Sequence, residues 1–385
     1  MSDINELADL LGDAEEIELS NFKLEAQYLE LSVLPQIIAH ALGVKPEAII
    51  ELVKFKFTPP AEKYKSRINE VTLGATKSEG GTRSHKLKIG GQTTMPFYFF
   101  EGKEQNRPVI SHDVFDMPIS LPSQIKAYFG DAMEDPADWA KLRVKKFGAQ
   151  MITLHMVSTD PTVKDLSVKD AAKIIEDVLQ AVKVPIIIGG SGNPEKDPPL
   201  LEKAAEVCAG ENVALSTVDP DMDYKRVSKA AVKHGHSVVS LVSMNPDEIR
   251  RLNKNLIKCG LREDQILMDP FTAGIGYGIE YSISAMERCR LAGLKGEKAL
   301  AFPMVSATSN SWSAREAWMA KEEWGPREKR GPLWEAATAL TALLCGADLF
   351  LMLHPHSIDT LDKMIDSLRE GPGKERDDYL SWLNV

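Results

Sequence analysis

Residues 184–197, VPIIIGGSGNPEKD, decide the fold of this chain. Residues 184–188 are apolar and mostly β-branched with no polar alternation, which is typical of a strand buried on both faces of a parallel sheet. Three glycines within residues 189–192 then end the strand. Pro194 and Asp197 precede an amphipathic pattern over residues 199–209, as at a helix start. The stretch therefore predicts a buried strand, a glycine loop and a helix.

The glycine loop has two interpretations. Glycines let a ligand approach the backbone closely, and the loop N–H groups could turn toward a polar ligand. The same glycines could instead serve a tight turn between strand and helix for steric reasons. The residues leave both interpretations open.

The alternation of strand and helix repeats eight times from residue 108 onward. We expect strands at residues 108–112, 150–157, 184–188, 213–218, 237–242, 265–269, 299–305 and 348–353. Helical patterns follow them at residues 136–147, 168–182, 200–209, 224–234, 246–259, 281–292, 333–344 and 360–368. Eight such units in about 260 residues predict an α/β fold of the (β/α)8 TIM-barrel type. The alternative is a doubly wound open sheet, but Glu195 stands where GxGxxG needs its third glycine, and GxxxxGK[ST] is absent.

The rest of the chain divides around this barrel. Residues 1–80 are expected to form an acidic N-terminal arm, a small helical appendage and a linker, because the first 30 residues hold nine acidic residues and one lysine. Residues 81–107 are expected to form a hairpin, with arms at 86–89 and 95–100, that plugs the bottom of the barrel. The barrel itself should span residues 108–370, and residues 371–385 should form a C-terminal tail.

Composition excludes several classes of protein. A net charge of −10 argues against nucleic acid as a partner. No apolar run approaches the roughly 18 residues of a membrane helix, and the first ten residues are acidic, unlike a signal sequence. We therefore expect a cytoplasmic protein without a membrane partner. The four cysteines lie far apart with no CxxC spacing, which argues against an iron–sulfur cluster or metal site of the chain's own.

In a TIM barrel, the residues that follow each strand form the functional face. Here these residues are rich in hydroxyls, amides and glycines and poor in Lys and Arg, a composition that suits a large, neutral, amide-bearing ligand. The candidate ligand-binding residues are Gly189, Gly190, Ser191, Gly192, Asn193, Asp219, Ser243, Asn245, Asp269, Thr272, Gly274, Ser306, Thr308, Asn310, Ser311 and His354.

No standard catalytic set emerges from this face. Asp113, Asp219 and Asp269 could form a carboxylate cluster for acid–base chemistry, or each could cap a helix. His354 and His356 could bind a metal or form a hydrogen-bonded pair at a strand end. The tryptophans of residues 306–332, which include Trp312 and Trp318, could anchor a partner protein or pack under a long loop.

Four runs carry a resemblance to a known family: PVISHDVFDMP, GGSGNPEKD, ILMDPFTAGIGYGIEYS and FPMVSATSNSWSAREAW. Over about residues 81–370 the chain resembles the delta subunits of archaeal acetyl-CoA decarbonylase/synthase complexes, the counterparts of the small subunit of bacterial corrinoid iron–sulfur proteins. The resemblance implies a TIM barrel that pairs, as a heterodimer, with a larger gamma subunit bearing an iron–sulfur cluster and a corrinoid. It also implies membership of a larger CO dehydrogenase/acetyl-CoA synthase assembly, in which a methyl group moves from a tetrahydropterin to cobalt and then to the acetyl-CoA-forming cluster.

The resemblance leaves two functions open. The chain could be an accessory subunit that encloses a corrinoid (cobalamin) shared with gamma and is not catalytic alone. In agreement with this role, the DxHxxG pattern that supplies a cobalt ligand in many corrinoid proteins is absent. Alternatively, the chain could be a pterin-dependent methyltransferase barrel that itself binds methyl-tetrahydropterin.

Overall fold

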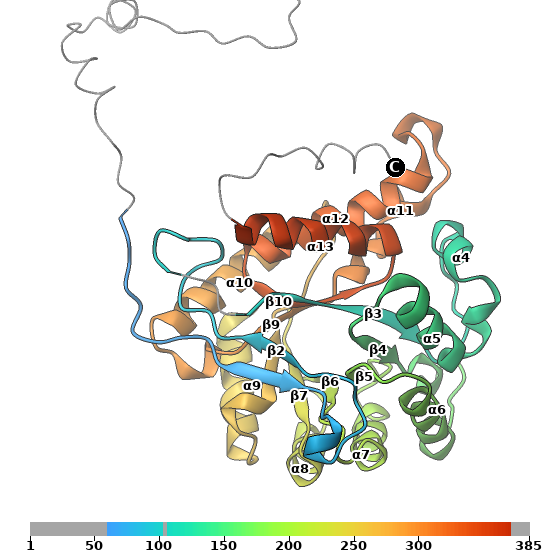
Figure 1. Ribbon diagram of the computed structural model, residues 1–385, viewed down its shortest axis with the longest axis horizontal. Coiled ribbons are helices and arrows are strands. Elements are labelled where there is room, and N and C mark those ends of the chain that lie inside the picture. The colour runs from blue at the N-terminus through green and yellow to red at the C-terminus, as the bar shows by residue number, and fades with distance from the viewer. Residues whose placement is uncertain (1–59, 103–105, 371–385) are drawn as a thin grey trace, which may run out of the picture. The chain divides into compact units, whose positions relative to one another are not determined.

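Eight parallel strands close into a barrel in the computed structural model, which describes residues 60–102 and 106–370 (Figure 1). The strands are β3 (Val109–Phe115), β4 (Ile152–His155), β5 (Ile186–Gly189), β6 (Ala214–Val218), β7 (Ser237–Leu241), β8 (Ile266–Asp269), β9 (Met304–Ser306) and β10 (Ala347–Met352). The order around the barrel follows the sequence, and β10 closes it by pairing with β3. The predicted TIM-barrel fold is confirmed.

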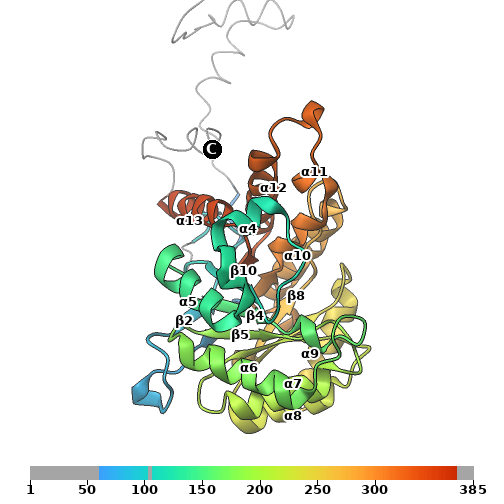
Figure 2. The same cartoon turned by 90° about the vertical axis from the view of Figure 1, so that its right-hand side faces the viewer.

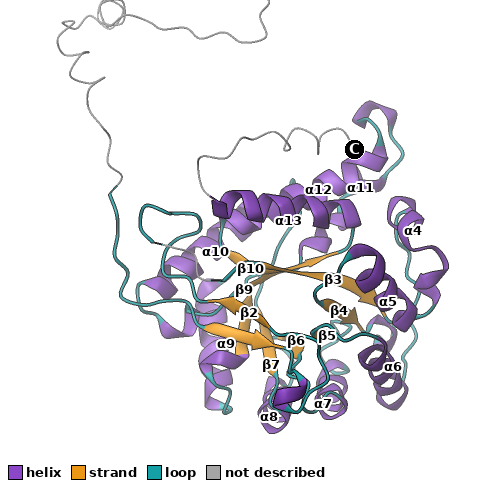
Figure 3. Ribbon diagram, viewed as in Figure 1, coloured by secondary structure: helices purple, strands orange, loops and turns teal. Residues whose placement is uncertain are grey.

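Helices surround the strands (Figure 3). The longer ones are α5 (Pro136–Phe147), α6 (Val168–Ala181), α7 (Asp197–Val207), α8 (Tyr224–His234), α9 (Pro246–Lys258), α10 (Ile279–Leu294), α12 (Arg327–Leu344) and α13 (Pro355–Glu370). Two shorter helices, α4 (Ser123–Phe129) and α11 (Arg315–Trp318), were not predicted from the sequence. Single 3-10 turns lie at Lys77–Glu79, Gly130–Glu134, Val157–Thr159, Glu263–Gln265, Lys298–Leu300, Thr308–Ser313 and Glu322–Trp324.

The core has two shells because successive strand side chains point to opposite faces. An inner cluster fills the barrel and includes Val109, Ile187 and Leu267. An outer cluster, which includes Ile110 and Ile188, packs between the strands and the helices. Both shells are apolar, which explains why the strands read as continuous hydrophobic runs.

The hairpin differs from the prediction. β1 (Glu70–Leu73) pairs antiparallel with β2 (Leu87–Gly90), whereas residues 95–100 form turns. The first arm therefore lies in the segment expected to be a linker, where the surrounding polar residues, prolines and glycines do not mark a strand. The aromatic run at 95–100 resembles a strand, but Pro96 and the positive φ of Phe97 (58°) interrupt it.

The two-stranded sheet packs against the barrel interior. Val71, Leu73 and Ile89 are buried in the inner cluster together with Val109 near the start of β3. Two buried arginines form ion pairs with acidic residues near the starts of β6 and β10. Arg83 pairs with Glu211 at 2.8 Å, and Arg290 pairs with Asp348 of β10 at 2.7 Å.

The acidic arm and helical appendage expected before residue 60, and the tail expected after residue 370, lie outside the described residues. Within the described part, no helix is both long and apolar enough to cross a membrane.

Candidate functional site at the carboxyl end of the barrel

Three titratable side chains face the inside of the barrel at its carboxyl end. Asp113, His155 and Asp269 each stand an even number of residues after a member of the inner cluster, Val109, Met151 and Leu267 respectively. Side chains at even spacing on a strand share a face, so these three project toward the mouth from the inner wall.

Asp113 and His155 form a close pair across β3 and β4. His155 Nε2 lies 3.1 Å from Asp113 Oδ1, and the His155 ring stacks on Phe115 with centroids 5.0 Å apart. The Asp113 carboxylate is fully buried and accepts no well-aligned hydrogen bond from any described residue. His155 was not predicted as a site residue, because in the sequence it is an ordinary member of the strand pattern ITLH.

Arg143 of α5 contacts Asp113 of this pair. It was also not predicted as a site residue. Its Nη2 donates to the Asp113 carbonyl oxygen at 2.8 Å, and its guanidinium lies 4.1 Å from the centroid of the Phe129 ring. Burial lowers the pKa of Arg143 to about 9, against the opposing effects of Asp113 and Glu335. The guanidinium therefore remains protonated at neutral pH and holds positive charge close to the Asp113 carboxylate.

Asp269 ends β8 in a buried position. Burial raises the pKa of its carboxyl to about 7, although the Phe271 N–H donates to Oδ1 at 2.8 Å and opposes the shift. Near neutral pH this carboxyl exists in both protonated and ionised forms. It can therefore donate or accept a hydrogen bond inside the mouth.

The glycine loop is organised around Asp197 at the start of α7. The N–H groups of Ser191 and Gly192 each donate to the Asp197 carboxylate at 2.8 Å, and the Gly190 N–H donates to the Ser216 carbonyl at 2.7 Å. A β-carbon on Gly190 would collide with that carboxylate. These N–H groups bond within the chain, and the approach of the Asp197 carboxylate gives Gly190 a steric reason to be glycine. Asn193 Oδ1 accepts from the backbone N–H groups of residues 195 and 196.

Two other candidates act as caps. Asp219 Oδ1 accepts from the N–H groups of Asp221 and Met222 at 2.8 and 3.1 Å. Asn245 precedes α9, and its Oδ1 accepts from residues 247 and 248 at 3.2 Å each. Ser243 lies on the surface just before Asn245.

Hydroxyl groups join the ends of β8 and β9. Ser306 Oγ lies 2.8 Å from Thr272 Oγ1 and 3.0 Å from Thr308 Oγ1, and all three residues are fully buried. Asn310 Nδ2 donates to the Thr272 carbonyl at 3.3 Å. Gly274 lies against Ser311, whose buried Oγ has no partner among the described residues. The structure thus brings six of the predicted residues together.

His354 belongs to a separate aromatic cluster. Its ring stacks on Trp312 at 5.7 Å between centroids, and its Nδ1 accepts from the His356 N–H at 3.2 Å. Burial lowers its pKa to about 3, with further lowering by His356 and Arg143, so the ring is neutral at physiological pH. The hydrogen-bonded interpretation of the two histidines therefore fits. Nowhere in residues 60–102 and 106–370 do three or more His, Cys, Asp or Glu side chains group to hold a metal ion.

The tryptophans of the long loop divide between core and surface. Trp312 is buried, whereas Trp318 of α11 is 40% exposed. Tyr277 and Tyr281 are also exposed, at 48% and 63%, and Tyr277 Oη donates to Glu316 Oε2 of α11 at 2.8 Å. We call Tyr277, Tyr281 and Trp318 the aromatic patch. Its residues come from two segments, the start of α10 and the end of α11, which the Tyr277–Glu316 hydrogen bond joins; both helices are labelled in Figure 2.

The closed barrel of parallel strands defines a TIM-barrel protein, a class of fold in which functional residues usually follow the strand ends. A family model described as the CO dehydrogenase/acetyl-CoA synthase delta subunit matches residues 70–322. The chain is 46% identical to the acetyl-CoA decarbonylase/synthase complex subunit delta of Methanocaldococcus jannaschii, over 97% of this chain and 94% of that protein. It is 48% identical to the subunit delta of Archaeoglobus fulgidus, over 83% of this chain and 72% of that protein. The chain belongs to this family of delta subunits, whose members are subunits of a multi-subunit complex.

Solved structures similar to this chain are dihydropteroate synthases. The enzyme of Xanthomonas albilineans matches with a TM-score of 0.48 and 18% identity, over 69% of this chain and 94% of that chain. The enzyme of Thermus thermophilus matches with a TM-score of 0.47 and 15% identity, over 78% of this chain and 99% of that chain.

Proposed function

We propose that this chain pairs with the gamma subunit of its complex and helps to enclose a corrinoid held mainly by gamma. In this role it serves methyl transfer between a tetrahydropterin and the acetyl-CoA-forming cluster. Membership of the delta-subunit family supports the complex. The aromatic patch is the observation that supports pairing with gamma at the carboxyl end of the barrel.

The patch has the composition of a protein-binding surface. Large aromatic side chains are enriched among the residues that dominate binding energy at interfaces, because they bury much area with few rotatable bonds. Tyr277 is held by its hydrogen bond to Glu316, so little side-chain entropy remains to be lost on binding. A partner that covers the patch would also cover the loops that follow β8 and β9.

Surface groups near the mouth fit a ligand edged with neutral amides. Ser243 and Asn310 are exposed, and the loops at residues 219–223, 242–245 and 270–278 contain no Lys or Arg. The hydroxyls of Thr272, Ser306 and Thr308 already bond to one another, so contacts to a corrinoid would come from Ser243, Asn310 and the half-buried Asp219. A bound corrinoid would supply the cobalt that carries the methyl group, while these residues bind its edge and the surrounding loops exclude water.

The pairing is tested by measuring the affinity of gamma for variants of this chain. Tyr281→Ala and Trp318→Ala should together weaken the heterodimer by about 2 kcal/mol or more, roughly 30-fold in dissociation constant. Phe100→Ala is the matched control, because Phe100 is an equally exposed aromatic in the loop that leads to β3. An unchanged affinity in the double variant would contradict the proposal.

A second function is favoured by one observation. The buried carboxyls of Asp113 and Asp269 face the inside of the mouth, where a carboxylate can accept the paired N–H groups of an aminopyrimidinone ring such as that of a pterin. If this barrel binds methyl-tetrahydropterin itself, calorimetry should detect micromolar tetrahydropterin binding to the isolated chain. Asp113→Asn should then weaken that binding. If the isolated chain binds no tetrahydropterin, the accessory role remains the proposed function.

A further inference from the structure

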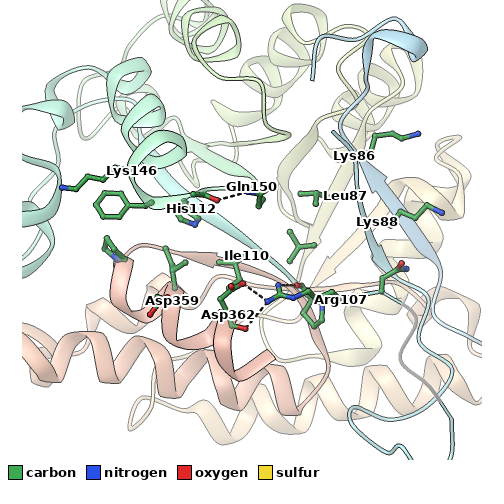
Figure 4. Close-up of a pocket in the computed structure, with 17 residues that line it drawn as sticks. Lys86, Leu87, Lys88, Arg107, Ile110, His112, Lys146, Gln150, Asp359 and Asp362 are labelled. Atoms are coloured by element: carbon green, nitrogen blue, oxygen red, sulfur yellow. Dashed lines mark hydrogen bonds and ion pairs between the residues drawn. The ribbon is translucent and has the colours of Figure 1, made fainter. Parts of the chain in front are cut away.

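A cavity lies on the outer side of the barrel wall, beside the first half of β3. It has a volume of about 820 Å³ and is bounded by β2, the first half of β3, the end of α5 and the first half of α13 (Figure 4). Its apolar lining includes Leu87, Ile110, Phe147 and Ile358. Because strand side chains alternate, His112 points to this cavity while its neighbour Asp113 points into the barrel.

His112 forms the polar part of the floor. Its residue surface is only 4% exposed, and its Nδ1 is buried with no partner among the described residues. Burial lowers the pKa of His112 to about 3, with the Arg143 charge adding to the shift, so the ring is neutral. We assign the single hydrogen of the neutral ring to Nε2, which leaves a lone pair on the buried Nδ1. Nε2 forms no bond to any described residue and is not fully buried, so it presents an N–H donor to the cavity.

The charges around the cavity leave an excess of positive groups. Both carboxylates of the lining are paired: Asp362 with Arg107 at 2.8 Å and Asp359 with Lys363 at 3.0 Å. Lys88 and Lys146, at opposite ends of the cavity, have no ion-pair partner in the described part of the chain. Their flexible stems can bring an ammonium group toward an anion in the cavity.

We propose that this cavity binds a small organic anion, with a carboxylate or phosphate group on an apolar body. One anionic oxygen accepts from His112 Nε2–H, and the body packs on Phe147 and Ile110. Lys88 and Lys146 supply the compensating charge. The cavity lies outside the barrel wall, so this inference does not rest on the proposed pairing with gamma.

The test uses calorimetry on the full chain with benzoate and phenyl phosphate as probes. Benzyl alcohol replaces the anionic group of benzoate by a neutral one, and inorganic phosphate lacks the apolar body. We expect both organic anions to bind at least about 10-fold more tightly than benzyl alcohol, since a hydrogen bond to a charged group is worth roughly 1.5–3 kcal/mol. Phenyl phosphate should also bind more tightly than inorganic phosphate.

Variants of the lining residues test whether the probes bind in this cavity. The double variant Lys88→Gln/Lys146→Gln and the single variant His112→Leu should each weaken benzoate binding, by about 5-fold or more. Lys145→Gln is the control, because Lys145 is exposed on α5 next to Lys146 but does not line the cavity. Because His112 is buried, circular dichroism must show that its variant is folded; if it is not, the lysine variant alone decides. Benzyl alcohol binding as tightly as benzoate, or unchanged affinity in the folded variants, would overturn the proposal.

Discussion

Individual aspartates at the barrel mouth have different roles although they occupy similar sequence positions. Asp219 caps a turn, Asp197 organises the glycine loop, and Asp269 is buried with a pKa raised to about 7. Of these, Asp269 has the clearest consequence for stability. In the unfolded chain its pKa is near the ordinary value of roughly 4, so between pH 4 and 7 the folded state holds a proton that the unfolded state lacks.

This shift predicts a pH-dependent effect of Asp269→Asn. The stability that Asp269 contributes is fully present below pH 4 and is lost as pH rises through 7, whereas asparagine does not titrate. The free energy of unfolding of the variant, relative to that of the wild type, should therefore rise by up to roughly 1.4 kcal/mol per pH unit between pH 5 and 7. Denaturant unfolding of both proteins at pH 5, 6, 7 and 8 measures the difference. A constant difference would mean that Asp269 is ionised throughout this range.

The roles of single residues could be predicted only in part, because a carboxylate after a strand is compatible with capping, loop organisation and ligand binding alike. The proximity of Thr272, Ser306 and Thr308 was implied by neighbouring strand ends. The pairing of Asp113 with His155 was not, since neither residue type nor spacing distinguishes an inward-facing strand residue from an outward-facing one when both shells are buried.

At the level of elements, periodicity identified the strands and the main helices, because each buries an apolar face over several turns or residues. It failed for the short elements. β1 and α11 have four residues each and lie outside the regular alternation of strand and helix, so no neighbouring pattern marks their positions. The glycine loop was located correctly, but its N–H groups bond to Asp197 and the Ser216 carbonyl, a set of contacts that depends on folding.

One buried contact between elements makes a testable prediction. Glu335 of α12 accepts from the N–H groups of Leu353 and His354 at 2.6 and 3.0 Å, which fixes the end of β10 to α12. Glu335→Ala would leave two buried donors without an acceptor and should lower the free energy of unfolding by about 2–5 kcal/mol.

Glu335→Gln keeps one acceptor oxygen and should cost less than Glu335→Ala. Glu328→Ala, on the exposed side of the same helix, should change stability little. Thermal or denaturant unfolding compares the three variants. If Glu335→Ala unfolds like Glu328→Ala, the two backbone bonds do not hold β10 in place.

At the scale of the whole molecule, the two regions proposed to bind other molecules lie on different parts of the barrel. The aromatic patch adjoins the loops after β8 and β9, whereas the cavity of His112 lies outside the wall between α5 and α13. No sequence pattern indicates the cavity, because the cavity depends on how far apart two helices pack. The sequence did indicate a tryptophan-rich loop, but only the structure separates the buried Trp312 from the exposed Trp318.

Hydrogen–deuterium exchange of this chain, alone and bound to gamma, tests the proposed pairing most directly. We expect slower exchange on binding in residues 270–281 and 307–318, which carry the aromatic patch and the loops after β8 and β9. Exchange in residues 148–150 and 355–362, beside the outer cavity, should stay unchanged. Protection confined to other parts of the barrel, with none in residues 270–281 and 307–318, would contradict the claim that gamma binds at the carboxyl end of the barrel.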